Sequence, residues 1–334
     1  MDKFLNVIIT GGCGFIGSHM VNYFVTKYPQ TKFYNIDKMY YCASKNNILV
    51  SDKPNYKFIA GDICDASLIK FILSEYRIDA IIHFAAQTHV DNSFSNSLQY
   101  TMDNVVGTHS LLESANLYGG LKLFFHVSTD EVYGESIIGD PSSQMHEQST
   151  LNPTNPYAAT KAGAEALVKA YNNSYNLPII ITRCNNVYGE RQYPEKLIPR
   201  FVNLLKANKK CTIHGNGTAH RSFIHVNDVC EAFDCILSKG GIGEIYNIGS
   251  EDEYSVMDVT KAIIQCIKPN DPWEQWITYV KDRDFNDQRY FINANKLKNL
   301  GWVQKIRFND SIKSIVEWYI ECDAEKYWNL KNII

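Results

Sequence analysis

The 334-residue sequence lacks an excess of charge of either sign, since 33 basic and 36 acidic side chains leave a formal net charge of −3 at pH 7. Surfaces that bind nucleic acid are usually strongly basic, so this balance argues against a nucleic-acid partner. The sequence also lacks any run of about 18 apolar residues, the length that a membrane-spanning helix needs. We therefore expect neither a nucleic-acid partner nor a membrane.

Paired cysteines are also lacking. The nine cysteines are an odd number, are scattered along the chain and include no C-x-x-C pair. This pattern argues against a zinc site and against a disulfide framework. The stretch before the first glycine cluster is too short for a secretory signal. We therefore expect a cytoplasmic protein with reduced thiols and no metal site.

The order of elements along the chain indicates an α/β protein. With 45% hydrophobic and 21% charged residues, the composition is that of a globular protein, and the length allows two domains. Short β-rich runs alternate with longer helical stretches up to about residue 182, which predicts βαβ units and a parallel sheet. The predicted strands span residues 7–10, 32–37, 56–62, 80–86, 123–129 and 179–183.

Beyond residue 183 this alternation loosens into loops, with helices expected at 197–207 and 226–238 and a strand at 245–248. We expect a Rossmann-type doubly wound sheet formed by residues 1–182 and about 220–250. A smaller, interleaved substrate-binding lobe would contain residues from about 183 to 219 and from 251 to 334. The tail 310–328 is predicted to form one amphipathic helix rich in aromatic residues.

A glycine-rich loop follows the first predicted strand. Gly11, Gly14 and Gly17 have the spacing G-x-x-G-x-x-G, a variant that is associated with short-chain dehydrogenases, and they lie between a predicted strand and a predicted helix. Without a Cβ the backbone can turn sharply and approach a pyrophosphate, whose charge the N–H groups of the helix N-terminus stabilise. Phe15 and Ile16 belong to the same predicted cofactor site.

Asp37 ends the second predicted strand, 20 residues after Gly17. A carboxylate at this position accepts hydrogen bonds from the adenosine ribose and repels a 2′-phosphate, which favours NAD over NADP. A glycine turn that binds nothing is the alternative, but three independent positions agree with a dinucleotide. The adenine and the middle of the cofactor are expected to lie against residues that follow the third and fourth strands: Asp62, Ile63, Phe84, Ala85 and Ala86.

Two residues in the helix that Asn155 and Pro156 open are candidates for catalysis. Tyr157 and Lys161 are one turn apart and therefore share a face of this helix. A phenol with a pKa of about 10 is a poor base. Beside the Lys161 ammonium and a cationic nicotinamide its pKa would fall, so that Tyr157 could take a proton from a substrate hydroxyl. Both residues are therefore expected at the catalytic and the cofactor site.

A second group of candidates, Thr129, Asp130 and Glu131, ends the strand predicted at 123–129. The carboxyl edge of a parallel sheet is where ligands of open α/β folds bind. Acidic residues there also complement the dipole of a following helix, which is the structural alternative. If burial raises the pKa of one carboxyl and hydrogen bonding lowers that of the other, a protonated Asp130 and an ionised Glu131 coexist at neutral pH.

With these residues in place, the chain resembles the extended short-chain dehydrogenase/reductase family, and within it the nucleotide-sugar 4,6-dehydratases. The resemblance covers essentially the whole chain and includes Thr129-Asp130-Glu131, which the related 4-epimerases lack. Segments 185–189 and 285–290 are similar to the first domain of plant rhamnose synthases, which act on UDP-glucose. Further matching segments are AAQTHVD at 85–91, RCNNVYG at 183–189, PEKLIP at 194–199, HVND at 225–228 and YNIG at 246–249.

The resemblance implies a UDP-glucose 4,6-dehydratase that oxidises C4 transiently with NAD, eliminates water across C5–C6 and returns the hydride to C6. Tyr157 would remove the C4 hydroxyl proton, Glu131 the C5 proton, and Asp130 would protonate the departing C6 hydroxyl. Thr88 and Thr129 would face the hexose, and Lys196 and Leu197 the nucleoside. The residues expected to bind the diphosphate are Asn186, Arg221, Asn247 and Arg283.

Alternative functions remain at this point: a dTDP-glucose 4,6-dehydratase, a UDP-hexose 4-epimerase, or an NAD-binding sensor without turnover. The acidic pair argues against the epimerase, and only the two loop segments argue against dTDP-glucose. Family members dimerise through the helix that begins at Pro156, and its alanines at 158, 162, 166 and 170 suit close packing, so we expect a homodimer. The plant enzymes continue into an epimerase/reductase domain, so a separate protein is expected to act downstream.

Overall fold

The computed structural model describes residues 3–282 and 285–328. Its larger part is built on a seven-stranded sheet in the order β10-β6-β5-β4-β1-β2-β3, in which every neighbouring pair is parallel. This order confirms the Rossmann-type doubly wound fold. The strands are β1 (Asn6–Thr10), β2 (Lys32–Asp37), β3 (Tyr56–Ala60), β4 (Ala80–His83), β5 (Leu123–Thr129), β6 (Ile179–Cys184) and β10 (Ile245–Ile248).

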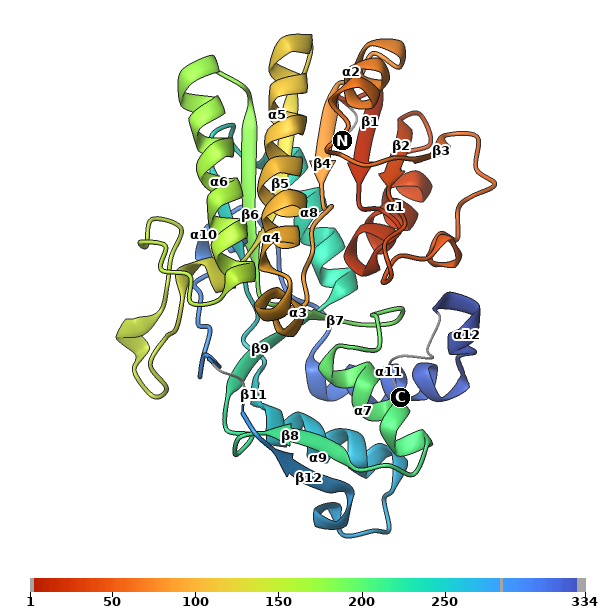
Figure 1. Ribbon diagram of the computed structural model, residues 1–334, viewed down its shortest axis with the longest axis vertical. Helices are drawn as coiled ribbons and strands as arrows, with labels where there is room; N and C mark the ends of the chain where they lie inside the picture. Colours follow the sequence, from red (N-terminus) through yellow and green to blue (C-terminus); the bar gives the residue numbers. More distant parts are fainter. Residues whose placement is uncertain (1–2, 283–284, 329–334) are drawn as a thin grey trace.

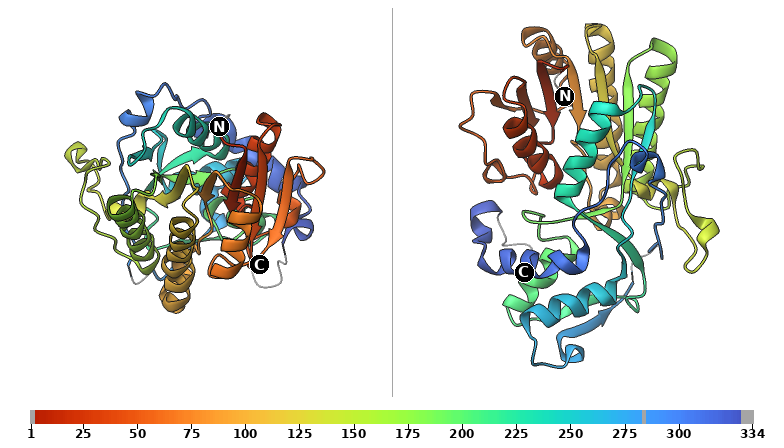
Figure 2. Two further views of the ribbon diagram at one scale, coloured as in Figure 1. Left: turned by 90° about the horizontal axis from the view of Figure 1, so that it is seen from above. Right: turned by 180° about the vertical axis from the view of Figure 1, so that it is seen from behind.

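Helices cover both faces of this sheet because its strands are apolar on both sides (Figures 1 and 2). Val7 and Ile9 pack in one core cluster, and Ile8 between them packs in the other. The first cluster lies under α1 (Phe15–Lys27) and α8 (Val226–Lys239). The second lies under α2 (Ala66–Glu75), α5 (Gly107–Tyr118) and α6 (Pro156–Tyr175).

A smaller lobe lies beyond the carboxyl ends of the parallel strands (Figure 1). It contains a three-stranded sheet, β11-β9-β7, and a two-stranded parallel sheet, β12-β8. A third apolar cluster fills this lobe. Its elements are β7 (Asn186–Tyr188), α7 (Leu197–Lys206), β8 (Cys211–His214), β9 (His220–His225), β11 (Glu253–Ser255), α9 (Val256–Ile267), β12 (Ile277–Val280), α11 (Phe308–Glu321) and α12 (Ala324–Tyr327).

Short helical segments connect the main elements. A π-helical turn over Thr101–Val106 leads into α5. The other short helices are α3 (Val90–Ser95), α4 (Ser97–Tyr100) and α10 (Asn295–Lys298), and 3-10 turns lie at Lys45–Asn47, Asp130–Tyr133, Pro141–Ser143 and Trp273–Trp276.

The C-terminal tail differs from its predicted single helix. The chain leaves the α-helical conformation at Cys322, and the Asp323 side chain accepts a hydrogen bond from the N–H of Glu325. An aspartate cap of this kind starts a new helix rather than extending the old one. The tail therefore forms α11 and a separate short α12.

Candidate active site

The glycine loop between β1 and α1 forms one wall of a cavity of about 480 Å³. Gly11 has a φ of +69°, and a Cβ on it would lie 2.6 Å from the Ala85 nitrogen; a Cβ on Gly17 would lie 2.3 Å from the Gly11 oxygen. At the start of α1, Gly14 offers no side-chain cap to the backbone N–H groups. These features fit a pyrophosphate that approaches the backbone closely and accepts from the helix N-terminus.

We expect Gly17→Ala to lower both stability and NAD affinity, because its Cβ would overlap a backbone oxygen that cannot move freely. Overpacking of this kind costs about 1–3 kcal/mol. Gly14→Ala is the matched control, since its Cβ would meet only the Gly11 oxygen at 3.4 Å. Thermal unfolding and NAD titration of the two variants check this, and equal losses in both would contradict the steric explanation.

Asp37 lies at the end of β2, where it is 8% exposed and lines the cavity. Its carboxylate accepts from the N–H groups of Cys13 at 2.9 Å and Met39 at 2.8 Å, so it is tied to the glycine loop. Lys38, which the sequence reasoning missed, also lines the cavity. Its ammonium pairs with Asp62 at 3.6 Å and with Asp103 at 2.6 Å, so it offers little unbalanced charge to a 2′-phosphate.

The other predicted cofactor residues line the same cavity: Phe15, Ile16, Asp62, Ile63, Phe84, Ala85 and Ala86. The close-packed glycines, the open helix N-terminus and the buried Asp37 together fit NAD. Among residues 3–282 and 285–328, no group of three or more His, Cys, Asp or Glu side chains is arranged to hold a metal ion. In the same part of the chain no helix has the length and apolar character needed to cross a bilayer.

Tyr157 and Lys161 lie in the first two turns of α6, and both are buried at the cavity wall. The Asn155 side chain caps this helix by accepting from the Ala158 N–H at 2.8 Å. The Lys161 ammonium donates to the Val127 carbonyl at 2.7 Å, and burial lowers the pKa of Lys161 to about 8. Burial and the Glu131 charge hold the pKa of Tyr157 well above 10. The predicted lowering of that pKa also requires the positive charge of a bound nicotinamide beside the phenol.

A second group of predicted catalytic residues lies at the same end of the cavity as Tyr157: Thr129, Asp130 and Glu131. Asp130 is 2% exposed and accepts from Asn185 Nδ2 at 2.6 Å and from Thr129 Oγ1 at 3.2 Å. Thr129 and Asn185 line the cavity, and Asp130 lies behind them. Burial, reinforced by the Glu131 charge, raises the pKa of Asp130 to about 7. A proton on Asp130 near neutral pH agrees with the sequence reasoning.

The pKa of Glu131 differs from the sequence-based expectation that hydrogen bonding lowers it. Its Oε2 accepts from Asn155 Nδ2 at 3.1 Å, which favours the charged form. Burial nevertheless dominates and raises the pKa of Glu131 above its ordinary value. The lowering considered from the sequence does not hold for Glu131, because the effect of burial on its pKa outweighs that of the hydrogen bond from the Asn155 amide.

Asp130 predicts a specific pH dependence. Its pKa is about 7 in the folded chain and about 3.9 when unfolded, so the folded state holds an extra proton between these values. Stability should therefore fall as pH rises from about 4 to about 7, by on the order of 4 kcal/mol from this group. Asp130→Asn should remove that part of the slope, measured by denaturant unfolding of both proteins across this range. Identical slopes would contradict the assignment.

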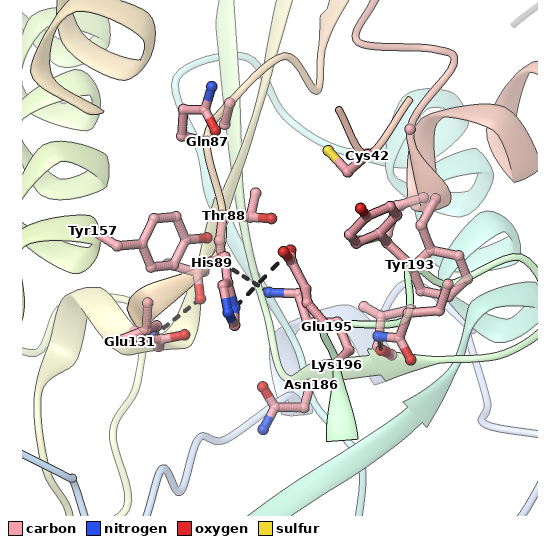
Figure 3. Close-up of a pocket in the computed structure, with 18 of the residues that line it drawn as sticks. Cys42, Gln87, Thr88, His89, Glu131, Tyr157, Asn186, Tyr193, Glu195 and Lys196 are labelled. Carbon is pink, nitrogen blue, oxygen red and sulfur yellow. Dashed lines mark hydrogen bonds and ion pairs between the residues drawn. The ribbon is translucent and has the colours of Figure 1, made fainter. Parts of the chain in front are cut away.

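Six of the predicted substrate residues line the same cavity: Thr88, Thr129, Asn186, Lys196, Leu197 and Arg221. Thr88, Lys196 and Asn186 surround the space in front of Tyr157 and Glu131 (Figure 3). Lys196 Nζ donates to the Thr88 carbonyl at 2.9 Å. Leu197 and Arg221 also line the cavity, and the Arg221 guanidinium lies over the Tyr290 ring at 4.7 Å.

One predicted diphosphate ligand, Asn247, does not line the cavity. Asn247 is fully buried away from the cavity wall, where its Oδ1 accepts from Tyr133 Oη at 2.8 Å and its Nδ2 donates to the Asn293 carbonyl at 3.0 Å. Both halves of its amide are thus engaged within the protein, which corrects the predicted contact. Arg283 lies outside the described residues.

The structure adds residues to which the sequence reasoning gave no role. His89 lies between Asp91, at 3.7 Å, and Glu195, at 4.0 Å, and Tyr41 Oη donates to Glu195 at 2.7 Å (Figure 3). His89 and Glu195 belong to the segments AAQTHVD and PEKLIP, so the motifs contained the signal. What the motifs could not show is that the two loops meet across the cavity.

Comparison with known proteins places this site in a family. Residues 8–315 match the family model described as GDP-mannose 4,6 dehydratase. The chain is 49% identical over 95% of its length to an Arabidopsis thaliana trifunctional UDP-glucose 4,6-dehydratase/UDP-4-keto-6-deoxy-D-glucose 3,5-epimerase/UDP-4-keto-L-rhamnose-reductase. It spans about half of that relative, 47% of its length.

Two further proteins are similar over nearly their whole length. The human dTDP-D-glucose 4,6-dehydratase is 46% identical over 98% of this chain and 92% of its own. The structure of the Streptomyces venezuelae dTDP-glucose 4,6-dehydratase with NAD bound superposes with a TM-score of 0.90 at 36% identity, covering 96% of this chain and 98% of that one. These matches confirm the predicted resemblance to nucleotide-sugar 4,6-dehydratases, with UDP-glucose and dTDP-glucose enzymes both among the relatives and NAD bound in the solved structure. The chain belongs to the GDP-mannose 4,6 dehydratase family, among the extended short-chain dehydrogenases.

Proposed function

We propose that the chain converts UDP-glucose to UDP-4-keto-6-deoxyglucose. The observation that carries this proposal is the gathering of Tyr157, Glu131 and the buried, protonatable Asp130 at one end of a cavity that begins at the glycine loop. A sugar carbon placed there has a base for its hydroxyl, a second base for the neighbouring C–H bond and an acid for the leaving oxygen. These three functions are what elimination from a transiently oxidised sugar requires.

Each residue has a defined task in this proposal. NAD, when bound, supplies the hydride acceptor for C4 and the hydride donor for C6. Tyr157 Oη removes the C4 hydroxyl proton, and the resulting ketone acidifies C5. A Glu131 carboxylate oxygen takes the C5 proton and Asp130 gives its proton to the departing C6 oxygen, with the Thr129 hydroxyl between Asp130 and the cavity. Water leaves, and C5 is protonated again when the hydride reaches C6.

UDP is favoured as the nucleotide by the loop segments 185–189 and 285–290 and by the 49% identity to the plant enzyme. Arg221 and Asn186 line the cavity and offer side-chain donors to the diphosphate, and Lys196 and Leu197 line the part of it in which we place the nucleoside. Arg283 remains a further proposed ligand of the diphosphate.

The test is a side-by-side incubation of the protein and NAD with UDP-glucose and dTDP-glucose, followed by mass spectrometry. We expect loss of one water, faster from UDP-glucose. Faster turnover of dTDP-glucose would move the assignment to a dTDP-glucose dehydratase. Unchanged mass with inversion at C4 would indicate a UDP-hexose 4-epimerase, and unchanged sugar a sensor.

We also propose a cytoplasmic homodimer. Leu98, Met102 and Val106 are exposed at four-residue spacing along α4 and the turn that leads into α5. On the neighbouring α6, Ala166 and Ala170 are exposed, whereas Ala158 is buried within the chain itself. An exposed apolar face of this kind suits a second copy. Light scattering should give twice the 38.2 kDa chain mass, and a monomer would contradict it.

The product of this reaction keeps a reactive ketone. A 4-keto-6-deoxy sugar is readily epimerised beside the carbonyl and then reduced, and the names of the plant relatives include both steps. We therefore propose that an epimerase/reductase activity consumes the product.

A further inference from the structure

The Asn155 side chain contacts both the helix that carries Tyr157 and the carboxylate of Glu131. Its side chain is 6% exposed and lines the cavity. Its Oδ1 accepts from the Ala158 N–H at 2.8 Å and so caps α6, the helix that carries Tyr157 and Lys161. Its Nδ2 donates to Glu131 Oε2 at 3.1 Å. One amide therefore joins the helix of the C4 base to the carboxylate of the C5 base.

The backbone around Asn155 is held by other contacts. The Asn152 N–H donates to the Val132 carbonyl at 3.1 Å, which fixes the preceding loop against the turn that contains Glu131. At Gly134, where φ is +80°, a Cβ would lie 2.2 Å from the Asn152 oxygen, so the two segments are in close contact. Loss of the Asn155 amide would therefore free the Glu131 side chain without separating the two segments.

The other groups that face Glu131 hold it less directly. Tyr290 Oη lies 3.5 Å from the same Oε2 and donates to Asp287 at 2.5 Å. Its proton is therefore used in the shorter hydrogen bond to Asp287 rather than in one to Glu131. Arg221 and Lys196 act on Glu131 through their charge, and no hydrogen bond to it is recorded for either among the described residues. The Asn155 amide is thus the shortest hydrogen-bond donor to this carboxylate in the described chain.

We propose that Asn155 is a positioning residue for the elimination step. The Asn155 Nδ2 keeps one Glu131 oxygen fixed, so that the other oxygen points at the C5 proton. The Asn155 Oδ1 holds the first turn of α6, and with it Tyr157, in a fixed position relative to Glu131. The inference rests on the proposed function, since it assigns to Asn155 the orientation of the base that removes the C5 proton.

Two substitutions separate this role from helix capping. Serine caps helices about as well as asparagine, so Asn155→Ser should unfold within about 2 °C of the wild type, whereas Asn155→Asp keeps the cap but places a second carboxylate beside Glu131. Neither offers an N–H to Glu131. Serine is too short to reach it, which should slow elimination about 10- to 100-fold, the usual effect of losing a hydrogen bond to a charged group. Aspartate adds a repelling carboxylate, so its loss should be larger.

The readout must distinguish oxidation at C4 from elimination. With UDP-glucose and NAD, we expect each variant to accumulate reduced nicotinamide, seen by its absorbance, while the dehydrated sugar forms slowly. Asp65→Ala is the control: it removes the cap of α2, whose Asp65 accepts from Ser67 and Leu68 and does not line the cavity. It should lower stability without this accumulation.

The outcomes are separable. If both steps slow equally in Asn155→Ser and Asn155→Asp, or if neither step slows, Asn155 does not position Glu131 and the inference is wrong. If the wild-type protein itself releases no dehydrated sugar, it is the proposed function that fails, and the inference falls with it.

Discussion

Glu131→Gln is expected to leave oxidation at C4 intact and to reduce elimination at least about 10³-fold, within the range for loss of a general base. Glutamine has the same shape, and its amide oxygen can still accept from Asn155 Nδ2. It cannot take up a proton from C5. The variant should therefore accumulate reduced nicotinamide with UDP-glucose and release almost no dehydrated sugar.

Glu113→Gln is the matched control for this variant. Glu113 is exposed on α5 and does not line the cavity, so its loss should leave turnover unchanged. Dehydration at the wild-type rate by Glu131→Gln would show that another group removes the C5 proton.

Tyr157→Phe is expected to slow both steps, lowering turnover about 10²- to 10⁴-fold. The ring is buried and packs edge-on against Tyr100 at 6.5 Å, and phenylalanine retains that packing. Only the hydroxyl that receives the C4 proton is lost. Absorbance should show no reduced nicotinamide and mass spectrometry no dehydrated sugar, while the melting temperature stays near that of the wild type.

A second tyrosine in α6 provides the comparison. Tyr171 Oη donates to Glu113 at 2.7 Å on the outer part of the helix, so Tyr171→Phe should change stability slightly and turnover not at all. Turnover by Tyr157→Phe within a few-fold of the wild type would remove Tyr157 from the role of base.

The sequence predicted what depends on local spacing. Short β-rich runs bounded by glycine or aspartate located β1, β2, β5 and β10. The glycine spacing located the loop from Gly11 to Gly17. The strands predicted at 56–62 and 80–86 end earlier in the structure, at Ala60 and His83, because the following residues turn into the cavity rather than continue the sheet. The break at Cys322 was missed because the aromatic stripe continues across it.

Properties that depend on enclosure were harder to predict. The motif around Asn247 could not show that its side chain faces Tyr133 rather than the cavity. The hydrogen bond between Asn185 and Asp130 joins residues 55 positions apart, and no local pattern announces it. Burial raises the pKa of Glu131 and the Asn155 amide lowers it. Which effect is larger depends on the folded chain and cannot be told from the sequence.

The central claim is that this one cavity moves hydrogen from C4 to C6 while the acidic pair expels water. It is tested most directly with UDP-glucose carrying deuterium at C4, by mass spectrometry and nuclear magnetic resonance of the product. The account predicts a sugar that has lost one water and carries the deuterium on C6. A dehydrated product without the label, or a sugar of unchanged mass, would contradict it.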